Sequence, residues 1–206
     1  MAGTGTAGYH GDHGPAARAA LNGVNGVHVH PDGRLLIADT NNHVVRQVGG
    51  DGTISMLAGT GEAGNGGDGG PADQAQLNEP ESVSVDRSGR IYIGDEANHN
   101  IRVIAPGGMI ATRIGDGARG FAKIGQPADE APLNDPEYLL ERADGSLVFS
   151  DGDTGRLLTF DPDGNVALVA GPAERSIDDA MRLLRPKAPQ VRAAYERRLR
   201  AAGLKD

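Results

Sequence analysis

The chain has 206 residues, no cysteine and no tryptophan, and a formal net charge of −8. Its 32 glycines are about twice the usual share, and because each interior glycine costs a helix about 0.5–1 kcal/mol, composition excludes a purely helical protein. The lack of cysteine excludes disulfides and thiolate metal sites, and no apolar stretch approaches the about 18 residues of a membrane-spanning helix. The first residues carry no charged region followed by an apolar run, so we expect no signal peptide and, as the chain stands, a cytoplasmic protein.

The sequence repeats with a period of 56 residues. The period predicts one supersecondary unit per copy, and the units span about residues 3–58, 59–114 and 115–171. The columns that are identical in the three copies include Gly3/Gly59/Gly115, Pro15/Pro71/Pro127, Leu21/Leu77/Leu133, Gly33/Gly89/Gly145 and Asp39/Asp95/Asp151. The chain up to residue 171 is therefore expected to be one domain built from three equivalent pieces.

Each unit begins with a Gly/Ala/Pro-rich stretch, which predicts a long surface loop with one helical turn after its proline. Short alternating or continuous apolar runs follow, separated by Asp-Gly or Gly-Gly turns, and predict four short antiparallel strands. The expected strands lie at residues 27–29, 35–37, 44–48 and 54–57, at 83–85, 91–93, 101–104 and 110–114, and at 147–149 and 166–169. Four such strands, repeated, favour an all-β fold of propeller blades over a sandwich.

The periodicity ends at Gly171, and residues 172–206 form a separate, basic tail. An N-terminal cap, acidic residues in the first turn and apolar stripes at helical spacing predict helix within residues 176–203. Residues 1–171 carry a net charge of −12 and residues 172–206 a net charge of +4. The acidic main part disfavours nucleic acid as a partner, because phosphate binding depends on cationic contacts.

Several polar columns have both a structural and a functional interpretation. The aspartates after each second expected strand, Asp39, Asp95 and Asp151, are predicted to accept backbone N–H bonds at a turn. His28 and His30 alternate on one strand of the first unit, which gives half of a zinc site or two solvated histidines. The Gly-rich loops lack the alternating carboxylates of a dedicated calcium loop. We therefore expect no cofactor, with a divalent metal (calcium or zinc) as the alternative.

A second candidate site precedes the first strand of each unit. Asn25, Glu81 and Glu137 occupy one column there, at the end of a propeller channel where ligands often meet the ring. These residues are interpreted as an acidic channel mouth, and solvated loop carboxylates are the alternative. Nucleophilic catalysis has no support, because the chain has no cysteine and no G-x-S-x-G motif.

Three segments resemble the NHL-repeat family: Leu35 to Val48, Ala58 to Pro80 and Tyr92 to Ile104. The family's namesake pair stands here as Asn42-His43 and Asn98-His99, and we interpret both pairs as structural. The third repeat departs from the pattern, with Thr154-Gly155 at that place. The resemblance implies a β-propeller, usually of six blades, and relatives that include protein- and RNA-binding modules, secreted repeat proteins and a few lyases. Because relatives are often secreted, the compartment stays open.

Three blades are half of the usual ring, and three explanations remain open. Two chains pair as a homodimer that completes six blades, the missing blades belong to a longer chain, or the helical tail covers an open face. Because fold does not fix function, the expected role is a non-catalytic binding or scaffold module for a protein partner or a small ligand. The alternative is a metal-dependent lyase or lactone hydrolase that uses the channel mouth.

Overall fold

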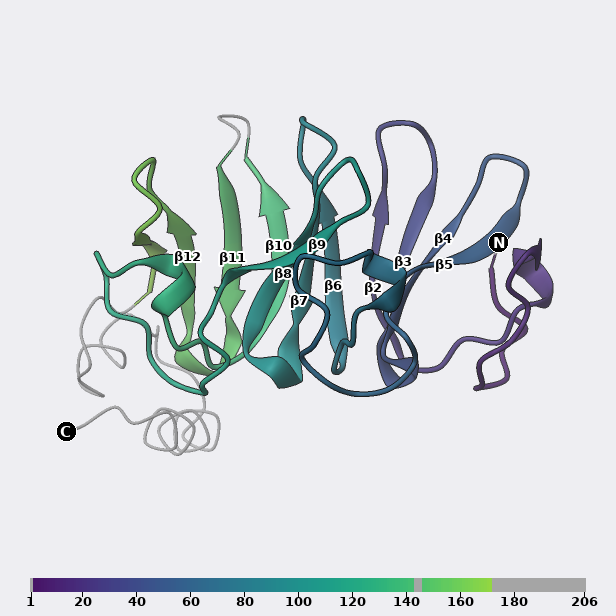
Figure 1. The fold of residues 1–206 in the computed structure, drawn as a ribbon, viewed down its shortest axis with the longest axis horizontal. Helices are drawn as coiled ribbons and strands as arrows, with labels where there is room; N and C mark the ends of the chain where they lie inside the picture. The colour runs from purple at the N-terminus through teal and green to yellow at the C-terminus, as the bar shows by residue number, and fades with distance from the viewer. Residues whose placement is uncertain (1, 143–145, 172–206) are drawn as a thin grey trace, which may run out of the picture.

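The structure is a computed structural model and describes residues 2–142 and 146–171 (Figure 1). Within these residues the chain forms three antiparallel sheets that follow one another along the sequence. The prediction of an all-β fold with three four-stranded blades is thereby confirmed. The predicted helical tail, residues 172–206, lies outside the described residues.

Each blade contains four strands whose order in the sheet follows the chain. The strands of blade 1 are β2 (Val24–Val29), β3 (Leu35–Asp39), β4 (Val44–Val48) and β5 (Thr53–Ala58). Those of blade 2 are β6 (Pro80–Val85), β7 (Ile91–Asp95), β8 (Asn100–Ile104) and β9 (Ile110–Ile114). Those of blade 3 are β10 (Pro136–Glu141), β11 (Leu147–Asp151), β12 (Arg156–Phe160) and β13 (Val166–Ala170).

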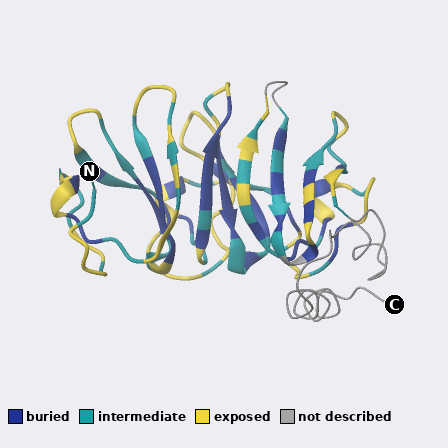
Figure 2. Cartoon of the chain, turned by 180° about the vertical axis from the view of Figure 1, so that it is seen from behind, coloured by how far each residue is buried: buried dark blue, intermediate teal, exposed yellow. Residues whose placement is uncertain are grey.

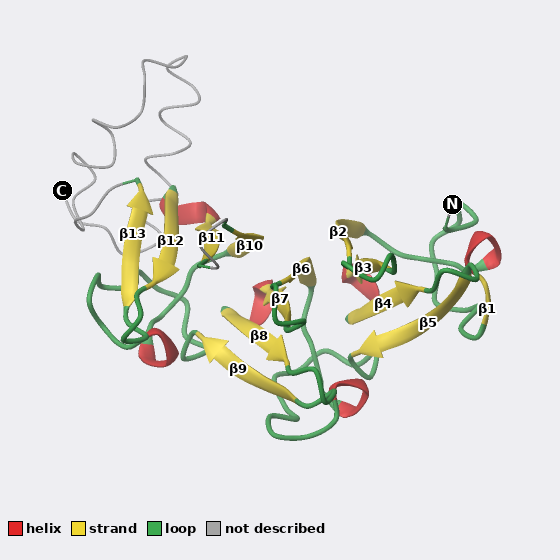
Figure 3. Ribbon diagram, turned by 90° about the horizontal axis from the view of Figure 1, so that it is seen from above, coloured by secondary structure: helices red, strands yellow, loops and turns green. Residues whose placement is uncertain are grey.

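The three blades lie side by side along an arc, as Figure 3 shows from above. The first strand of each blade, β2, β6 or β10, lies on the concave side, and the last strand lies on the convex side. β6 contacts both β2 and β10, so the concave side is a row of three neighbouring strands. This arrangement is that of consecutive blades in a β-propeller, whose first strands line the central channel.

The loop before each blade returns along the last strand of the same blade. In blade 1 the two-residue strand β1 (Gly14–Pro15) pairs with β5, and in the other blades single bridges join Pro71 to Met109 and Pro127 to Asn165. A single 3₁₀ turn follows the proline, as the sequence predicts; these turns are η1 (Ala16–Arg18), η3 (Ala72–Gln74) and η5 (Ala128–Glu130). Each loop therefore covers the outer edge of its blade, which would otherwise expose unpaired backbone groups.

A second set of 3₁₀ turns connects the second strand to the third in each blade. These turns are η2 (Thr40–Asn42), η4 (Glu96–Asn98) and η6 (Gly152–Thr154). The residue that ends each turn, His43, His99 or Gly155, has a positive φ between 54° and 68°. The turns lie at the same end of the blades as the first residues of β2, β6 and β10, because those residues pair with the last residues of β3, β7 and β11.

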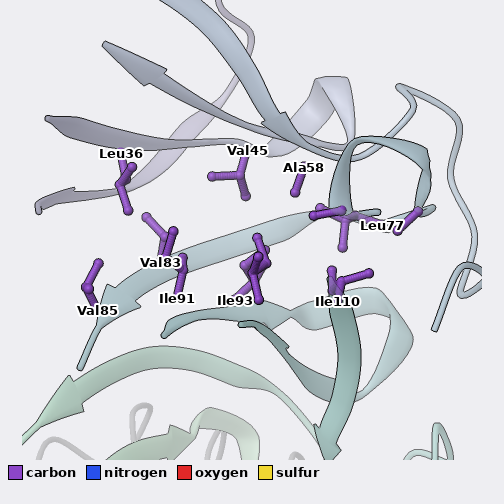
Figure 4. Packing of buried hydrophobic residues seen from close by; sticks show 12 residues of the cluster. Leu36, Val45, Ala58, Leu77, Val83, Val85, Ile91, Ile93 and Ile110 are labelled. Carbon is purple, nitrogen blue, oxygen red and sulfur yellow. The ribbon is translucent and has the colours of Figure 1, made fainter. Parts of the chain in front are cut away.

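The hydrophobic core lies between blades. Leu36 and Val45 of blade 1 pack against Val83 and Ile93 of blade 2, with Leu77 of the connecting loop between them (Figure 4). An equivalent cluster, which includes Ile101, Ile114, Leu133, Phe149 and Leu158, joins blade 2 to blade 3. Burying one such side chain contributes about 1.5–3 kcal/mol, so the contacts between neighbouring blades hold the blades together.

Candidate functional site

The aspartate that ends each second strand fixes the loop that enters its blade. Its Oδ1 accepts a hydrogen bond from the backbone N–H of the asparagine seventeen residues earlier, and the carboxylate is fully buried. The N···O distances are 2.6 Å for Asn22–Asp39, 2.7 Å for Asn78–Asp95 and 2.8 Å for Asn134–Asp151. A carboxylate in this position closes a turn and offers no free oxygen to a substrate.

The asparagine–histidine pairs connect the turn after the second strand of a blade to nearby loops. Asn98 donates to Asp95 at 2.8 Å and to the carbonyl of Gly64 at 2.7 Å. The backbone N–H of Glu79 donates to His43 Nδ1 at 3.2 Å, and His99 Nδ1 lies 3.0 Å from the carbonyl of Asn134. Each histidine therefore contacts the loop that leads into the next blade.

Two buried arginines form ion pairs with the aspartates of the Gly-rich loops. Arg46 lies 2.7 Å from Asp12, and Arg102 lies 2.5 Å from Asp68. Both arginine side chains are 0% exposed, and each also lies within 3.7 Å of its blade's repeated aspartate. The loop carboxylates therefore neutralise buried cations, which gives both aspartates a structural role. Sequence reasoning did not single out these arginines.

Of the pair His28 and His30, the predicted half of a zinc site, His28 lies on β2 and His30 directly follows that strand. His30 Nδ1 lies 2.7 Å from Asp32, and its Nε2 lies 3.4 Å from the guanidinium of Arg34. Partial burial, together with the neighbouring imidazole of His30, lowers the pKa of His28. Among the described residues no group of three or more His, Asp or Glu side chains is placed to hold a metal ion. A zinc site needs three or four ligands, so a site at His28 and His30 would need further ligands beside these two histidines.

The column of Asn25, Glu81 and Glu137 coincides with a β-bulge in each blade. The pairing of the first and second strands shifts by one residue between Val24 and Gly26, between Pro80 and Ser82, and between Pro136 and Leu139. The extra residue in the first two cases is Asn25 or Glu81, and in the third the shifted stretch includes Glu137. A bulge turns a side chain away from the regular alternation and is frequent next to functional sites.

The structure brings Asn25 and Glu81 together, since Asn25 Nδ2 donates to Glu81 Oε1 at 2.9 Å across the boundary between blades 1 and 2. Glu137 lies further along the arc, with its carboxylate against Gly152; a Cβ at position 152 would lie 2.7 Å from it. The residue of blade 2 that corresponds to Gly152 is Glu96, which sequence reasoning missed. Glu96 shares a hydrogen bond with Asp135, the residue two positions before Glu137.

These carboxylates form what we call the acidic row: Glu79, Glu81, Glu96, Asp135 and Glu137. Partial burial, the hydrogen bond to Asp135 and the negative charges of Asp135 and Glu81 raise the pKa of Glu96 to about 8. Partial burial and the charge of Asp135 also raise the pKa of Glu81, although the hydrogen bond from Asn25 opposes this shift. Burial and the negative charges of the row therefore favour the protonated forms of Glu81 and Glu96.

The fold and the repeated bulges define the chain as a set of propeller blades that presents an acidic row where the first strands begin. Among the described residues, no helix has the length and apolar character needed to cross a lipid bilayer.

Comparison with known proteins identifies the repeats. A family model of the Teneurin NHL domain matches residues 54–124. NHL repeat-containing protein 2 of Bos taurus is 33% identical over 124 residues, which cover 59% of this chain. The chain spans only 17% of that protein's length. Both matches are to NHL-repeat proteins and support the resemblance of these repeats to the NHL-repeat family.

Solved structures are similar in fold. A protein of unknown function from Bacteroides thetaiotaomicron has a TM-score of 0.56 and 18% identity, and the match covers 72% of this chain and 36% of that chain. An auxiliary nutrient binding protein from Bacteroides ovatus has a TM-score of 0.53 and 20% identity, with 68% of this chain and 36% of that chain covered. At these identities the likeness shows the fold alone.

Proposed function

We propose that this chain is a non-catalytic binding module whose acidic row receives a cationic group of a protein partner or a small ligand. The observation that carries the proposal is the bulge repeated in all three blades at the column of Asn25, Glu81 and Glu137. A bulge turns a side chain away from the regular alternation of a strand and is frequent next to functional sites. The repeated aspartates and the loop aspartates, by contrast, are occupied in structural contacts.

The charges of the row indicate the chemistry of the ligand. Partial burial and then the negative charge of Asp135 raise the pKa of Glu81. Partial burial, the hydrogen bond to Asp135 and the charges of Asp135 and Glu81 raise that of Glu96. An ammonium or guanidinium group placed between them would offset these negative charges and would form charge-assisted hydrogen bonds. Binding would then release the proton held by Glu96, so the affinity should rise as the pH approaches about 8.

The test uses an oligolysine peptide as the probe, with an oligoglutamate peptide as its counterpart, in isothermal titration calorimetry at low salt. We expect the oligolysine peptide alone to bind, about tenfold more weakly to Glu81→Gln and more strongly at about pH 8.5 than at about pH 6. The matched control is Glu62→Gln, which removes an exposed carboxylate from a loop outside the row. Equal affinities of Glu81→Gln and Glu62→Gln would contradict the proposal.

An enzyme is the second candidate, a metal-dependent lyase or lactone hydrolase at the same mouth. The observation that favours it is the carboxyl pair of Glu96 and Asp135, because a group with a pKa of about 8 exchanges protons near neutral pH. A metal that this reaction required would have to bind carboxylates of the row. Metal analysis of the purified protein, followed by melting with and without EDTA, distinguishes the candidates. Stoichiometric, tightly held metal would favour the enzyme.

A further inference from the structure

The four most exposed large apolar side chains of the described residues lie on the first strands of blades 1 and 3. Val27 and Val29 on β2 are 63% and 67% exposed, and Tyr138 and Leu140 on β10 are 70% and 64% exposed. Figure 2 shows β6 dark blue, with β2 and β10 carrying exposed residues on either side of it. Single exposed apolar residues are ordinary, but two pairs at equivalent places need an explanation.

The repeat register identifies the two surfaces. Val27 and Val29 occupy the columns of Val83 and Val85, which blade 1 buries to 5% exposure. We call this surface of blade 1 the leading face. Tyr138 and Leu140 occupy the columns of Ser82 and Ser84, which lie in the buried boundary with blade 3. We call this surface of blade 3 the trailing face; it also exposes Leu157, whose counterpart Ile101 is 0% exposed.

The trailing face is more apolar than its buried counterpart. Two serines stand at the boundary between blades 2 and 3. Tyrosine and leucine stand at the same columns of blade 3, on a surface that residues 2–142 and 146–171 leave exposed. Exposure to water gives no stabilisation to such residues, but burial of each against a partner contributes about 1.5–3 kcal/mol. The pattern therefore indicates a partner that covers this face.

We propose that the partner is a second copy of this chain, with the trailing face of each copy packed on the leading face of the other. The chain itself already contains this contact twice, between blades 1 and 2 and between blades 2 and 3. A second copy supplies the one surface that these boundaries show to fit a leading face, the trailing face of another blade. Because both faces are used in the same way, the pair has two-fold symmetry and closes into a ring of six blades.

Closure also completes the candidate site. One copy carries three of the bulged mouth residues, and the ring carries six, with Asn25 of one copy next to Glu137 of the other. The pairing stands on the exposed faces and not on the proposed ligand, so a monomer could still bind a cationic peptide, and a dimer could fail to do so. The two proposals can therefore fail separately.

The test is the mass of the full-length protein in solution, by light scattering and sedimentation over a range of about 1–100 µM. We expect a species of twice the chain mass of 21.3 kDa, with no larger assemblies. Val29→Lys and Leu140→Lys should each give a monomer with an unchanged circular dichroism spectrum, because a lysine on either face disrupts both contacts. The matched control is Ile124→Lys, an exposed apolar position in a loop, which should remain a dimer.

Mixing the two variants gives a sharper result. A Val29→Lys chain keeps an intact trailing face and a Leu140→Lys chain an intact leading face, so the mixture should form a weaker dimer through one contact. A wild-type monomer throughout the range would overturn the proposal, and loss of stability in that monomer on Leu140→Lys would assign the face to residues 172–206. A series of growing oligomers would overturn ring closure.

Discussion

The middle blade and the two outer blades share a backbone and differ in what covers them. β6 has the same length as β2 and β10 and pairs with its second strand in the same bulged register. Both faces of β6 are buried, whereas β2 and β10 each keep one face exposed. The repeated sequence therefore determines the fold of a blade, whereas the blades on either side determine which of its residues are buried. Substitutions in matched columns separate these two contributions.

The largest expected effect comes from a charge introduced at the first interblade boundary. Val83→Asp would bury a carboxylate among Leu36, Val45 and Ile93, at a cost of about 4 kcal/mol in the free energy of unfolding. That cost approaches the whole stability of an ordinary domain, so the variant should be largely unfolded. Urea denaturation followed by circular dichroism measures the change.

The matched substitution is Val27→Asp in the same column of blade 1. To keep the chain monomeric, both variants are made in the Leu140→Lys background. Val27 is 63% exposed, so the free energy of unfolding should change by no more than about 0.5 kcal/mol. Equal costs for the two aspartates would show that the leading face is covered within the monomer and would break the comparison.

Much of the fold could be predicted from the sequence, because the 56-residue period multiplies weak local signals. Turn residues between short apolar runs located ten of the twelve blade strands, all but β10 and β12, and the proline of each loop located its 3₁₀ turn. The pairing of β1 with β5 could not be predicted in this way. Gly14 and Pro15 have no alternating pattern, and their partner Ile54 lies forty residues away in the chain.

The site was predictable in part. Aligning the repeats places Asn25, Glu81 and Glu137 in one column, but a bulge depends on the partner strand and leaves no mark in a single strand's sequence. Glu96 was missed because its counterparts are Thr40 and Gly152, so its column is not repeated. Its raised pKa depends on partial burial and on Asp135, which the neighbouring blade supplies.

The buried arginines were missed because arginine is usually a surface residue. A signal was present in the repeats. Where Asp12 and Asp68 stand in the first two copies, the third copy has Ile124, and the arginine column holds Leu158 there. The carboxylate and the cation are therefore lost together, and in blade 3 Arg156 reaches Asp151 at 3.1 Å from another position.

An intermediate effect is expected at the glycine that follows the last strand of a blade. Gly59 has φ +95°, and a Cβ there would lie 2.5 Å from the carbonyl oxygen of His43. Gly3, in the same column, has φ +91°, but its Cβ would meet only Leu21, at 3.4 Å. Alanine is strained at the positive φ of both positions, which destabilises both variants. Only Gly59→Ala also forces the backbone of blade 1 to shift.

Gly59→Ala should therefore lower the free energy of unfolding by about 3 kcal/mol and Gly3→Ala by about 1 kcal/mol. Thermal melting of the two purified variants measures the difference. If both cost the same, the close approach to His43 would contribute nothing beyond the strain that the two positions share.

A smaller effect than that of Gly59→Ala is expected in the pH dependence of the boundary between blades 2 and 3. The pKa of Glu96 is raised from 4.5 to about 8, so between these values the folded chain binds a proton that the unfolded chain releases. Stability is therefore greatest below about pH 4.5 as far as this group is concerned, and it falls as the pH rises toward 8. Because the side chain is partly exposed, solvent screening limits the loss to about 1 kcal/mol, or about 3 °C in Tm.

Glu96→Gln should remove this part of the slope, because a neutral amide replaces the carboxyl group that loses its proton. Asp95, whose pKa burial raises to about 6, contributes to the slope of both proteins, so the difference between wild type and variant isolates Glu96. Melting curves from about pH 5 to pH 9 measure it, with Glu62→Gln as the control at an exposed loop position. A wild-type slope no steeper than that of Glu96→Gln would mean that Asp135 does not hold a proton on Glu96. The acidic row would then carry its full negative charge at neutral pH.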